Sequence, residues 1–214
     1  TEFVMPDGSF VTDFTYYDHE IIEGSVGMDT LPGAYGADQT LKITLKDKAF
    51  PVFIDLYYSV FEKADVITRR AVVRNEADGP VIMRRIMSML LDMPDENFYM
   101  YTLDGGWIKE AHLHKRQVTY GTVSNSSITG ASSNRHNPAF MLAEADAGED
   151  YGNVYGFNII YSGNHYSIVQ KNERDYVRIS MGINPHCFEW KLNKGEKFEA
   201  PECVLTFSSH GFNG

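Results

Sequence analysis

The sequence is poor in cysteine, in basic residues and in long apolar runs, and each shortage excludes a class of protein. Its two cysteines, Cys187 and Cys203, are too few for a disulfide scaffold of 214 residues. Their apolar neighbours predict buried, reduced thiols, with a disulfide between them as the alternative. Lysine and arginine total 19 against 29 acidic residues, and this formal net charge of -10 argues against a nucleic-acid partner. No apolar run approaches the ~20 residues of a membrane span, and no signal-peptide pattern opens the chain, so we expect no membrane partner.

Motifs that would identify a catalytic or cofactor site are also missing. No glycine-rich phosphate loop leads from a strand into a helix, and no nucleophile elbow is present. His112 and His114 share one face of an expected strand, but a third zinc ligand with supporting spacing is lacking. Acidic residues are plentiful, yet none has a catalytic signature around it. The residues alone therefore identify no catalytic site, although a glycosidase pair of carboxylates could still form in the folded chain, and we expect no metal site and no cofactor.

What the sequence does contain is a series of strand-forming segments. Aromatic and β-branched residues cluster in short runs separated by Gly, Pro, Asp and Asn, whereas no segment keeps apolar residues at helical spacing over three turns. These runs predict an all-β fold, a sandwich of two large antiparallel sheets. No repeat or linker divides the chain, so we expect residues 1–214 to form a single domain. The chain begins within strand-like sequence, TEFVMPDGSF, without an initiator methionine, which predicts a domain truncated at its N-terminus.

Two segments predict specific strand pairings. Residues 2–22 indicate a hairpin, because Asp7 and Gly8 can supply the positive φ that its turn needs. Residues 52–93 predict three long antiparallel strands, joined by turns at FEKAD and EADGP.

The faces of two expected strands can also be assigned. Residues 39–47 (QTLKITLKD) alternate in polarity, which predicts an apolar face toward the core and a polar face outward. The inward set is Leu41, Ile43 and Leu45, and the outward set is Lys42, Thr44 and Lys46. Farther along the chain, Arg70 and Arg74 share one strand face and Arg69 lies on the other. With a net negative chain, these arginines favour ion pairs within or between subunits.

A polar loop at residues 130–140 (GASSNRHNPAF) is the first candidate binding feature. Three of its residues can bond the backbone of their own turn, namely Ser132, Ser133 and Asn134. Asn137 precedes Pro138 and is therefore held in extended geometry. Self-stabilisation of the loop leaves Arg135 and His136 unexplained, so they are candidates for reaching a partner.

Trp107 is the second candidate. It follows two glycines in LDGGWIKEAHLHKR. An aromatic ring beside a flexible turn can stack on a sugar face, and the same ring can instead fill a core or an interface. The sequence leaves both alternatives open.

Several segments in a fixed order resemble one known family. VTDFTYYDHEIIEG, LPGAYG followed by ADQTLKITLKD, and ITRRAVVRNEADGPVIMRRIMSMLLDMP come first. LDGGWIKEAHLHKR, GASSNRHNPAFMLAE, EDYGNVYGFNIIYSGNH and MGINPHCFEWKLNKGEKFEAPECVLTFSSHGFNG follow. Together they closely resemble the N-terminal domain of glycoside hydrolase family 36 α-galactosidases, the bacterial type that cleaves raffinose and melibiose. Asn134 departs from the family's Ser-Ser-His pattern, so a structural role of the loop transfers more safely than any role that needs an imidazole there.

The resemblance implies a β-supersandwich similar to galactose mutarotase domains. It also implies a catalytic pair of aspartates on a (β/α)₈ barrel that would follow residue 214, so this fragment is expected to be inactive alone. The expected partners are the chain's own catalytic barrel, other copies in a homo-oligomer that is often a tetramer, and an α-galactoside substrate. Trp107, Arg135, His136 and Asn137 are the expected substrate-border or interface residues, and the expected location is the cytoplasm.

Two other hypotheses stand beside this one. The chain could be a stand-alone carbohydrate-binding module that uses Trp107 and the polar loop. It could also be an independent mutarotase-like sugar epimerase, in which a histidine and a glutamate transfer protons.

Overall fold

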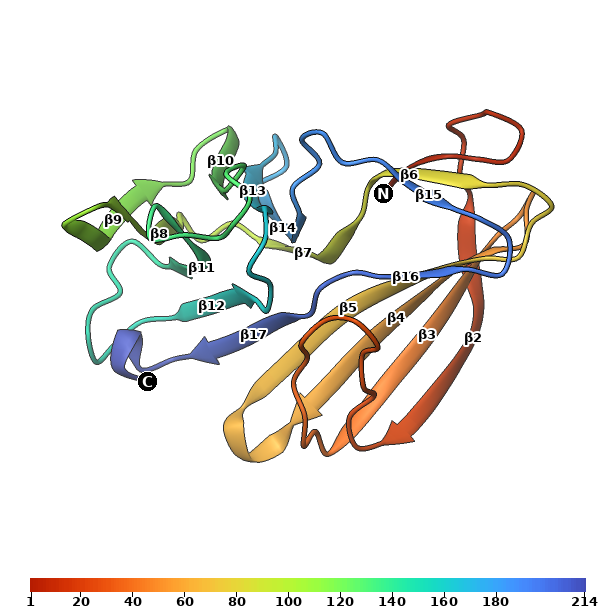
Figure 1. Ribbon diagram of the computed structural model, residues 1–214. Helices are drawn as coiled ribbons and strands as arrows, with labels where there is room; N and C mark the ends of the chain where they lie inside the picture. Colours follow the sequence, from red (N-terminus) through yellow and green to blue (C-terminus); the bar gives the residue numbers. More distant parts are fainter. The chain divides into compact units, whose positions relative to one another are not determined.

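The computed structural model describes residues 1–214 and consists almost entirely of β-structure (Figure 1). It contains seventeen strands and two short 3₁₀ helices, and the strands pair in antiparallel sheets. The expected all-β class is confirmed. The chain folds as two compact units, one of Thr1–Ser88 with Ile183–Glu202 and one of Met89–Gly182 with Cys203–Gly214. A single domain over residues 1–214 stays a prediction.

The first unit is a two-layer sandwich. Its larger sheet has the order β2-β3-β4-β5 with β16 beside β5, and its smaller sheet has the order β1-β6-β15. Side chains from both sheets form one apolar core, which includes the fully buried Phe3, Val52, Val73 and Met83. The elements are β1 (Glu2–Val4), β2 (Phe14–Glu23), β3 (Gln39–Asp47), β4 (Val52–Phe61), η1 (Glu62–Ala64), β5 (Val66–Asn75), β6 (Val81–Arg85), β15 (Trp190–Leu192) and β16 (Lys197–Glu199).

The predicted hairpin of residues 2–22 is wrong, although its turn forms. Gly8 has a φ of 84° and donates its backbone N–H to Met5 O at 2.8 Å. The strands on either side of this turn nevertheless join different sheets, since β1 pairs with β6 and β2 pairs with β3. The reason is burial: Phe3 in β1 packs into the core from the smaller sheet, whereas most of β2 is exposed at the edge of the larger one.

The segment 52–93 forms four strands rather than the predicted three. The first two, β4 and β5, pair along their whole length as expected. The third predicted strand is interrupted at Ile86, which is buried in the core, and it becomes β6 and β7 (Met87–Pro94). These two strands belong to different sheets.

The predicted outward face of β3 is in fact buried. Thr40 and Thr44 are almost fully inaccessible, whereas Leu41, Ile43 and Leu45 on the other face are only half-buried. The inward prediction is confirmed for Leu45, which packs against the core. The outward prediction is wrong for Thr44 because the connection between β2 and β3 folds back over this side of the sheet (Figure 1). The buried polar groups find partners there. Thr44 Oγ1 donates to Asp55 Oδ1 at 2.8 Å, and Thr40 Oγ1 lies 2.8 Å from Ser59 Oγ.

The second unit is also a two-layer sandwich. Its larger set of strands has the order β17-β12-β11-β8-β9, and its smaller sheet has the order β10-β13-β14-β7. The core between them includes Phe98, Met100, Leu142, Val169 and Met181. The elements not yet given are β8 (Tyr99–Gly106), β9 (Lys109–Gln117), β10 (Gly121–Ser126), β11 (His136–Ala143), β12 (Val154–Ile159), β13 (His165–Lys171), β14 (Tyr176–Ile183), β17 (Cys203–Ser208) and η2 (Gly211–Asn213).

The two cysteines lie in different surroundings. Cys203 is buried in β17, as predicted, but Cys187 is exposed, and no disulfide joins them. The burial prediction fails for Cys187 because it sits in a turn closed by a hydrogen bond from Phe188 N to Pro185 O, with its own φ at 56°. Neither short helix has the length and hydrophobicity that crossing a membrane would require.

Candidate functional site

The β8–β9 hairpin ends in two exposed apolar side chains. Trp107 is 87% exposed and Ile108 is 73% exposed. Ile108 has a φ of 64°, which is strained for a β-branched residue, and its backbone N–H donates to Glu110 Oε1 at 3.0 Å. The structure thus excludes a core position for Trp107 and leaves its ring available to a sugar or to another protein surface.

The two glycines before Trp107 have different roles. A Cβ atom on Gly105 would lie 1.8 Å from the carbonyl oxygen of Lys109, so only glycine allows the strands to approach this closely. A Cβ atom on Gly106 would have no atom within 4 Å. The pairing register also shifts between Asp104 and Gly106, as at a β-bulge. Gly105 therefore shapes the hairpin tip, and the expected flexible turn is instead a tightly packed one.

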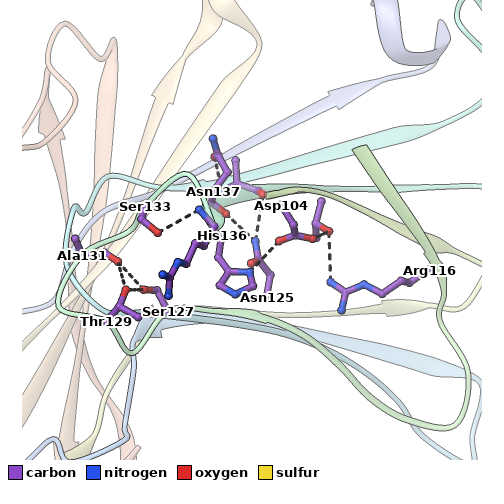
Figure 2. A network of polar contacts seen from close by, with 12 residues as sticks. Asp104, Arg116, Asn125, Ser127, Thr129, Ala131, Ser133, His136 and Asn137 are labelled. Carbon is purple, nitrogen blue, oxygen red and sulfur yellow. Dashed lines mark hydrogen bonds and ion pairs between the residues drawn. The ribbon is translucent and has the colours of Figure 1, made fainter. Parts of the chain in front are cut away.

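The polar loop is joined to this hairpin (Figure 2). The backbone N–H of Gly105 donates to Arg135 O at 3.1 Å, and His136 Nδ1 lies 3.0 Å from Asp104 Oδ1. Asn134 Nδ2 donates to Glu110 Oε1 at 3.4 Å. The loop and the Trp107 turn therefore lie side by side.

The carboxylate of Asp104 is the centre of the contact. Its Oδ2 accepts a hydrogen bond from Thr102 Oγ1 at 2.5 Å, and Arg116 Nη2 donates to the same Thr102 oxygen at 3.5 Å. Burial by itself would raise the pKa of Asp104. The hydrogen bonds from Thr102 and His136, with the charges of His136 and Arg116, outweigh burial and hold this pKa below its ordinary value. Asp104 therefore stays ionised and fixes the ring of His136.

The loop residues divide into internal supports and links to other segments. Ser133 supports its own turn, as predicted, since its Oγ accepts from Arg135 N at 3.1 Å. The same prediction is wrong for Ser132 and Asn134. Ser132 Oγ donates to Tyr161 O at 3.4 Å, and Asn134 bonds the β8–β9 hairpin instead.

Asn137 lies in β11 rather than in the loop, and a side chain of β10 fixes its backbone. The buried Asn125 donates its Nδ2 to Asn137 O at 2.7 Å (Figure 2). Asn137 Oδ1 accepts from Ala139 N at 3.2 Å. These bonds make Asn137 a positioning residue. Asp104, Glu110 and Asn125 were not anticipated, because nothing in their strand sequences distinguishes them from other polar residues.

Arg135 has the opposite character. Its side chain is exposed and makes no hydrogen bond or ion pair within the chain. Its backbone, by contrast, is fixed at both ends of the residue by the bonds to Gly105 and Ser133. A guanidinium on a fixed backbone with no internal partner is suited to contact another surface.

An apolar hollow lies on the outer side of the same strands. Its volume is about 320 Å³, and its lining includes Tyr101, Leu103, Met141, Gly156 and Val204. These residues come from β8, β11, β12 and β17 and form one face of the sheet. These residues are buried or half-buried, and an apolar hollow of this kind is suited to receive a side chain of another surface. The side chains of His, Cys, Asp and Glu form no cluster of three or more that could hold a metal ion.

The whole chain was compared with known families and structures. The family described as "Glycosyl hydrolase family 36 N-terminal domain" matches residues 2–193. The chain belongs to this family.

The relatives of this family 36 domain are much longer proteins. Alpha-galactosidase AgaA of Geobacillus stearothermophilus is 36% identical over 214 residues, which are 98% of this chain and 29% of AgaA. Alpha-galactosidase 2 of Hypocrea jecorina is 35% identical over 210 residues, 97% of this chain and 28% of that protein. This family 36 domain therefore spans less than a third of the length of these relatives.

Solved structures give the same match. The crystal structure of AgaA from Geobacillus stearothermophilus has a TM-score of 0.96 at 35% identity and covers 100% of this chain and 30% of its own. The α-galactosidase from Lactobacillus brevis has a TM-score of 0.95 at 33% identity, covering 98% of this chain and 29% of its own. The fold of the family 36 domain is thus confirmed over its full length.

Proposed function

We propose that this chain is the non-catalytic N-terminal domain of an α-galactosidase that removes terminal α-galactosyl residues from melibiose and raffinose-type oligosaccharides with retention. The observation that carries the proposal is the match of nearly the whole chain to under a third of proteins named α-galactosidases. AgaA variants have been crystallised with raffinose and with stachyose, which fits this substrate class.

The chemistry is proposed to lie outside this chain. Retaining glycosidases use two carboxyl groups about 5 Å apart, one as nucleophile and one as acid/base. Two carboxylates of the first unit, Asp55 and Glu199, line a polar cavity over β3, β4, β5 and β16, and neighbouring cations engage them instead. A catalytic barrel after residue 214 would supply the reacting aspartates.

The role of this domain is proposed to be docking and assembly. The hairpin tip with Trp107 and Ile108, the side chain of Arg135 and the apolar hollow beside them would face the catalytic barrel or a neighbouring subunit of a homotetramer. His136 and Asn137 would hold this border in place. The protein is proposed to act in the cytoplasm.

A substitution of Arg135 in the longer enzyme tests this role. Arg135→Ala is expected to raise KM about fivefold, the equivalent of ~1 kcal/mol for a lost interface contact, or to shift the oligomer toward smaller species. Trp107→Ala is expected to act in the same direction. The measurements are steady-state kinetics on melibiose and light scattering after size-exclusion chromatography.

The matched control is Arg174→Ala. Arg174 is an exposed arginine of the same unit, and its ion-pair partner is the adjacent Glu173 at 3.9 Å. The Arg174→Ala variant should have the KM and the oligomeric state of the parent enzyme. An unchanged oligomer and KM in Arg135→Ala, with kcat alone collapsed, would contradict a docking role.

The exposure of Trp107 is also consistent with an alternative function, a stand-alone carbohydrate-binding module. That alternative requires the isolated 214-residue chain to bind melibiose or raffinose. Titration calorimetry without measurable heat for either sugar would eliminate it.

A further inference from the structure

The first unit contains a polar cavity that the proposed function does not use. It has a volume of about 420 Å³, within the range of small-ligand sites. It lies over the face of the sheet formed by β3, β4, β5 and β16, beside the backbone of Val26 and Gly27. The ionisable side chains that line it are Lys42, Asp55, Tyr57, Arg70, Arg74, Lys197 and Glu199.

Most of these charges are already paired. Asp55 Oδ2 lies 2.8 Å from Arg74 Nε, and Asp55 Oδ1 accepts from Thr44. Lys197 Nζ lies 2.6 Å from Asp29 Oδ2 and 3.5 Å from Glu199 Oε1. The carboxylates of the cavity are thus compensated by cations from neighbouring strands.

Two cations at one side of the cavity are not compensated in the same way. The side chain of Lys42, which is half-buried, makes no hydrogen bond or ion pair in the chain. Arg70 is 2% exposed, and its Nη1 makes no hydrogen bond, the nearest carboxylate oxygen being Glu199 Oε1 at 3.8 Å. Its Nη2 donates to the carbonyls of Val26 and Gly27, each at 3.1 Å.

Strand register places these two cations in one row. Lys42 is paired with Tyr57, and Tyr57 with Arg70, on three adjacent strands. The Arg70 guanidinium stacks on the Tyr57 ring, 4.2 Å from its centroid. The other two cations of the cavity are each paired twice, Arg74 with Asp55 and Glu76, and Lys197 with Asp29 and Glu199. The Lys42 ammonium and Arg70 Nη1 are therefore the cationic groups of the cavity without a hydrogen-bonded carboxylate, and such groups are suited to bind an anion.

We propose that this cavity binds a small oxyanion, an organic phosphate or carboxylate of up to monosaccharide size. Lys42 makes the direct ion pair with the anion, and the buried guanidinium of Arg70 adds positive charge to the cavity lining. This site is independent of α-galactoside cleavage, since a neutral substrate has no group that needs these cations.

Titration calorimetry on the 214-residue chain at low ionic strength tests the proposal. The titrants are inorganic phosphate, galactose 1-phosphate, galacturonate and neutral galactose. Binding of at least one of the three anions is expected, and raised salt should weaken it. The two phosphates and galacturonate distinguish a phosphate site from a carboxylate site. No binding of any anion, or equal binding of galactose, would overturn the proposal.

Variants of Lys42 locate the site. Lys42→Met is expected to weaken anion binding at least tenfold, and Lys42→Arg should keep most of it. The matched control is Lys63→Met, which removes the same charge from an exposed turn outside the cavity and should leave the affinity unchanged. Equal effects of Lys42→Met and Lys63→Met would show that only overall charge matters, which would also overturn the assignment. Circular dichroism of each variant establishes that the fold is intact.

Discussion

Arg70→Met is expected to lower the free energy of unfolding by about 3–5 kcal/mol, the usual consequence of removing one partner from a buried ion pair. The Arg70 side chain is almost fully buried and anchors the β2–β3 connection through the carbonyls of Val26 and Gly27. Its loss would leave these carbonyls without their donor and would leave the buried Glu199 with Lys197 as its main counterion. For a chain of this size the loss corresponds to a fall in Tm of roughly 6–20 °C. Urea unfolding followed by circular dichroism measures it.

Two further variants distinguish the contribution of the Arg70–Glu199 ion pair from a nonspecific loss of stability on replacing an arginine of β5. Arg69→Met removes a neighbouring, less buried arginine from the other face of β5, and its cost should be clearly smaller. In the double variant Arg70→Met with Glu199→Gln, part of the lost stability should return, because the buried charge is removed as well. If Arg70→Met costs less than about 1 kcal/mol, the buried polar face does not stabilise the unit as described here.

Acidification is expected to destabilise the second unit through His165. This histidine is fully buried, and burial, with a smaller contribution from the charge of His136, lowers its pKa to about 4. In the unfolded chain its pKa is ordinary, about 6.5. The lowered folded pKa means that protonation favours the unfolded state. The folded state therefore has its full stability above about pH 6.5, where His165 is neutral in both states, and loses stability as the pH falls from about 6.5 to 4. The free energy of unfolding is expected to fall by about 2 kcal/mol at pH 5 and by ~3 kcal/mol at pH 4.

The variant His165→Gln isolates this contribution. Its own stability at pH 8 can be lower, but the decline between pH 8 and pH 5 should be about 2 kcal/mol shallower than in the parent chain. Urea titrations at pH 8, 6.5 and 5 give the comparison. The same decline in both proteins would assign the acid sensitivity to other groups, such as the paired carboxylates.

The strands could be predicted from the sequence, but their partners could not. Local composition places β3, β4 and β5 correctly, because β-branched and aromatic runs bounded by turn residues are local signals. The failed hairpin shows the limit. The Asp7–Gly8 turn forms as its chemistry demands, yet β1 pairs with β6, about 80 residues away, because Phe3 belongs in the core.

The unexpected burial of the polar face of β3 has a similar cause. Alternation of polarity predicts which residues share a face, and it did so correctly for Lys42 and Thr44. It cannot show that another segment covers the polar face. Here the β2–β3 connection covers this face, and Glu202 holds the connection in place. The Glu202 carboxylate accepts hydrogen bonds from Ala34 N and from Thr68 Oγ1, each at 2.6 Å. These partners lie 168 and 134 residues away in the sequence. Contacts between residues this far apart leave no local signal.

The candidate site was predictable to the same degree. The family resemblance grouped Trp107 with the loop residues as one expected border, and the sequence correctly assigned Ser133 to its own turn. It could not supply Asp104 or Asn125, which link the two features from inside strands. It also misjudged Gly105, because the close approach of the Lys109 carbonyl exists only in the folded hairpin.

We propose that the longer protein is an α-galactosidase and that this family 36 domain does not itself catalyse the reaction. Hydrolysis of melibiose, followed by galactose release, tests it most directly when the 214-residue chain is compared with a longer protein that continues past residue 214. We expect turnover by the longer protein and none by the 214-residue chain alone. Turnover by the isolated chain, or an inactive longer protein that is correctly folded, would contradict it.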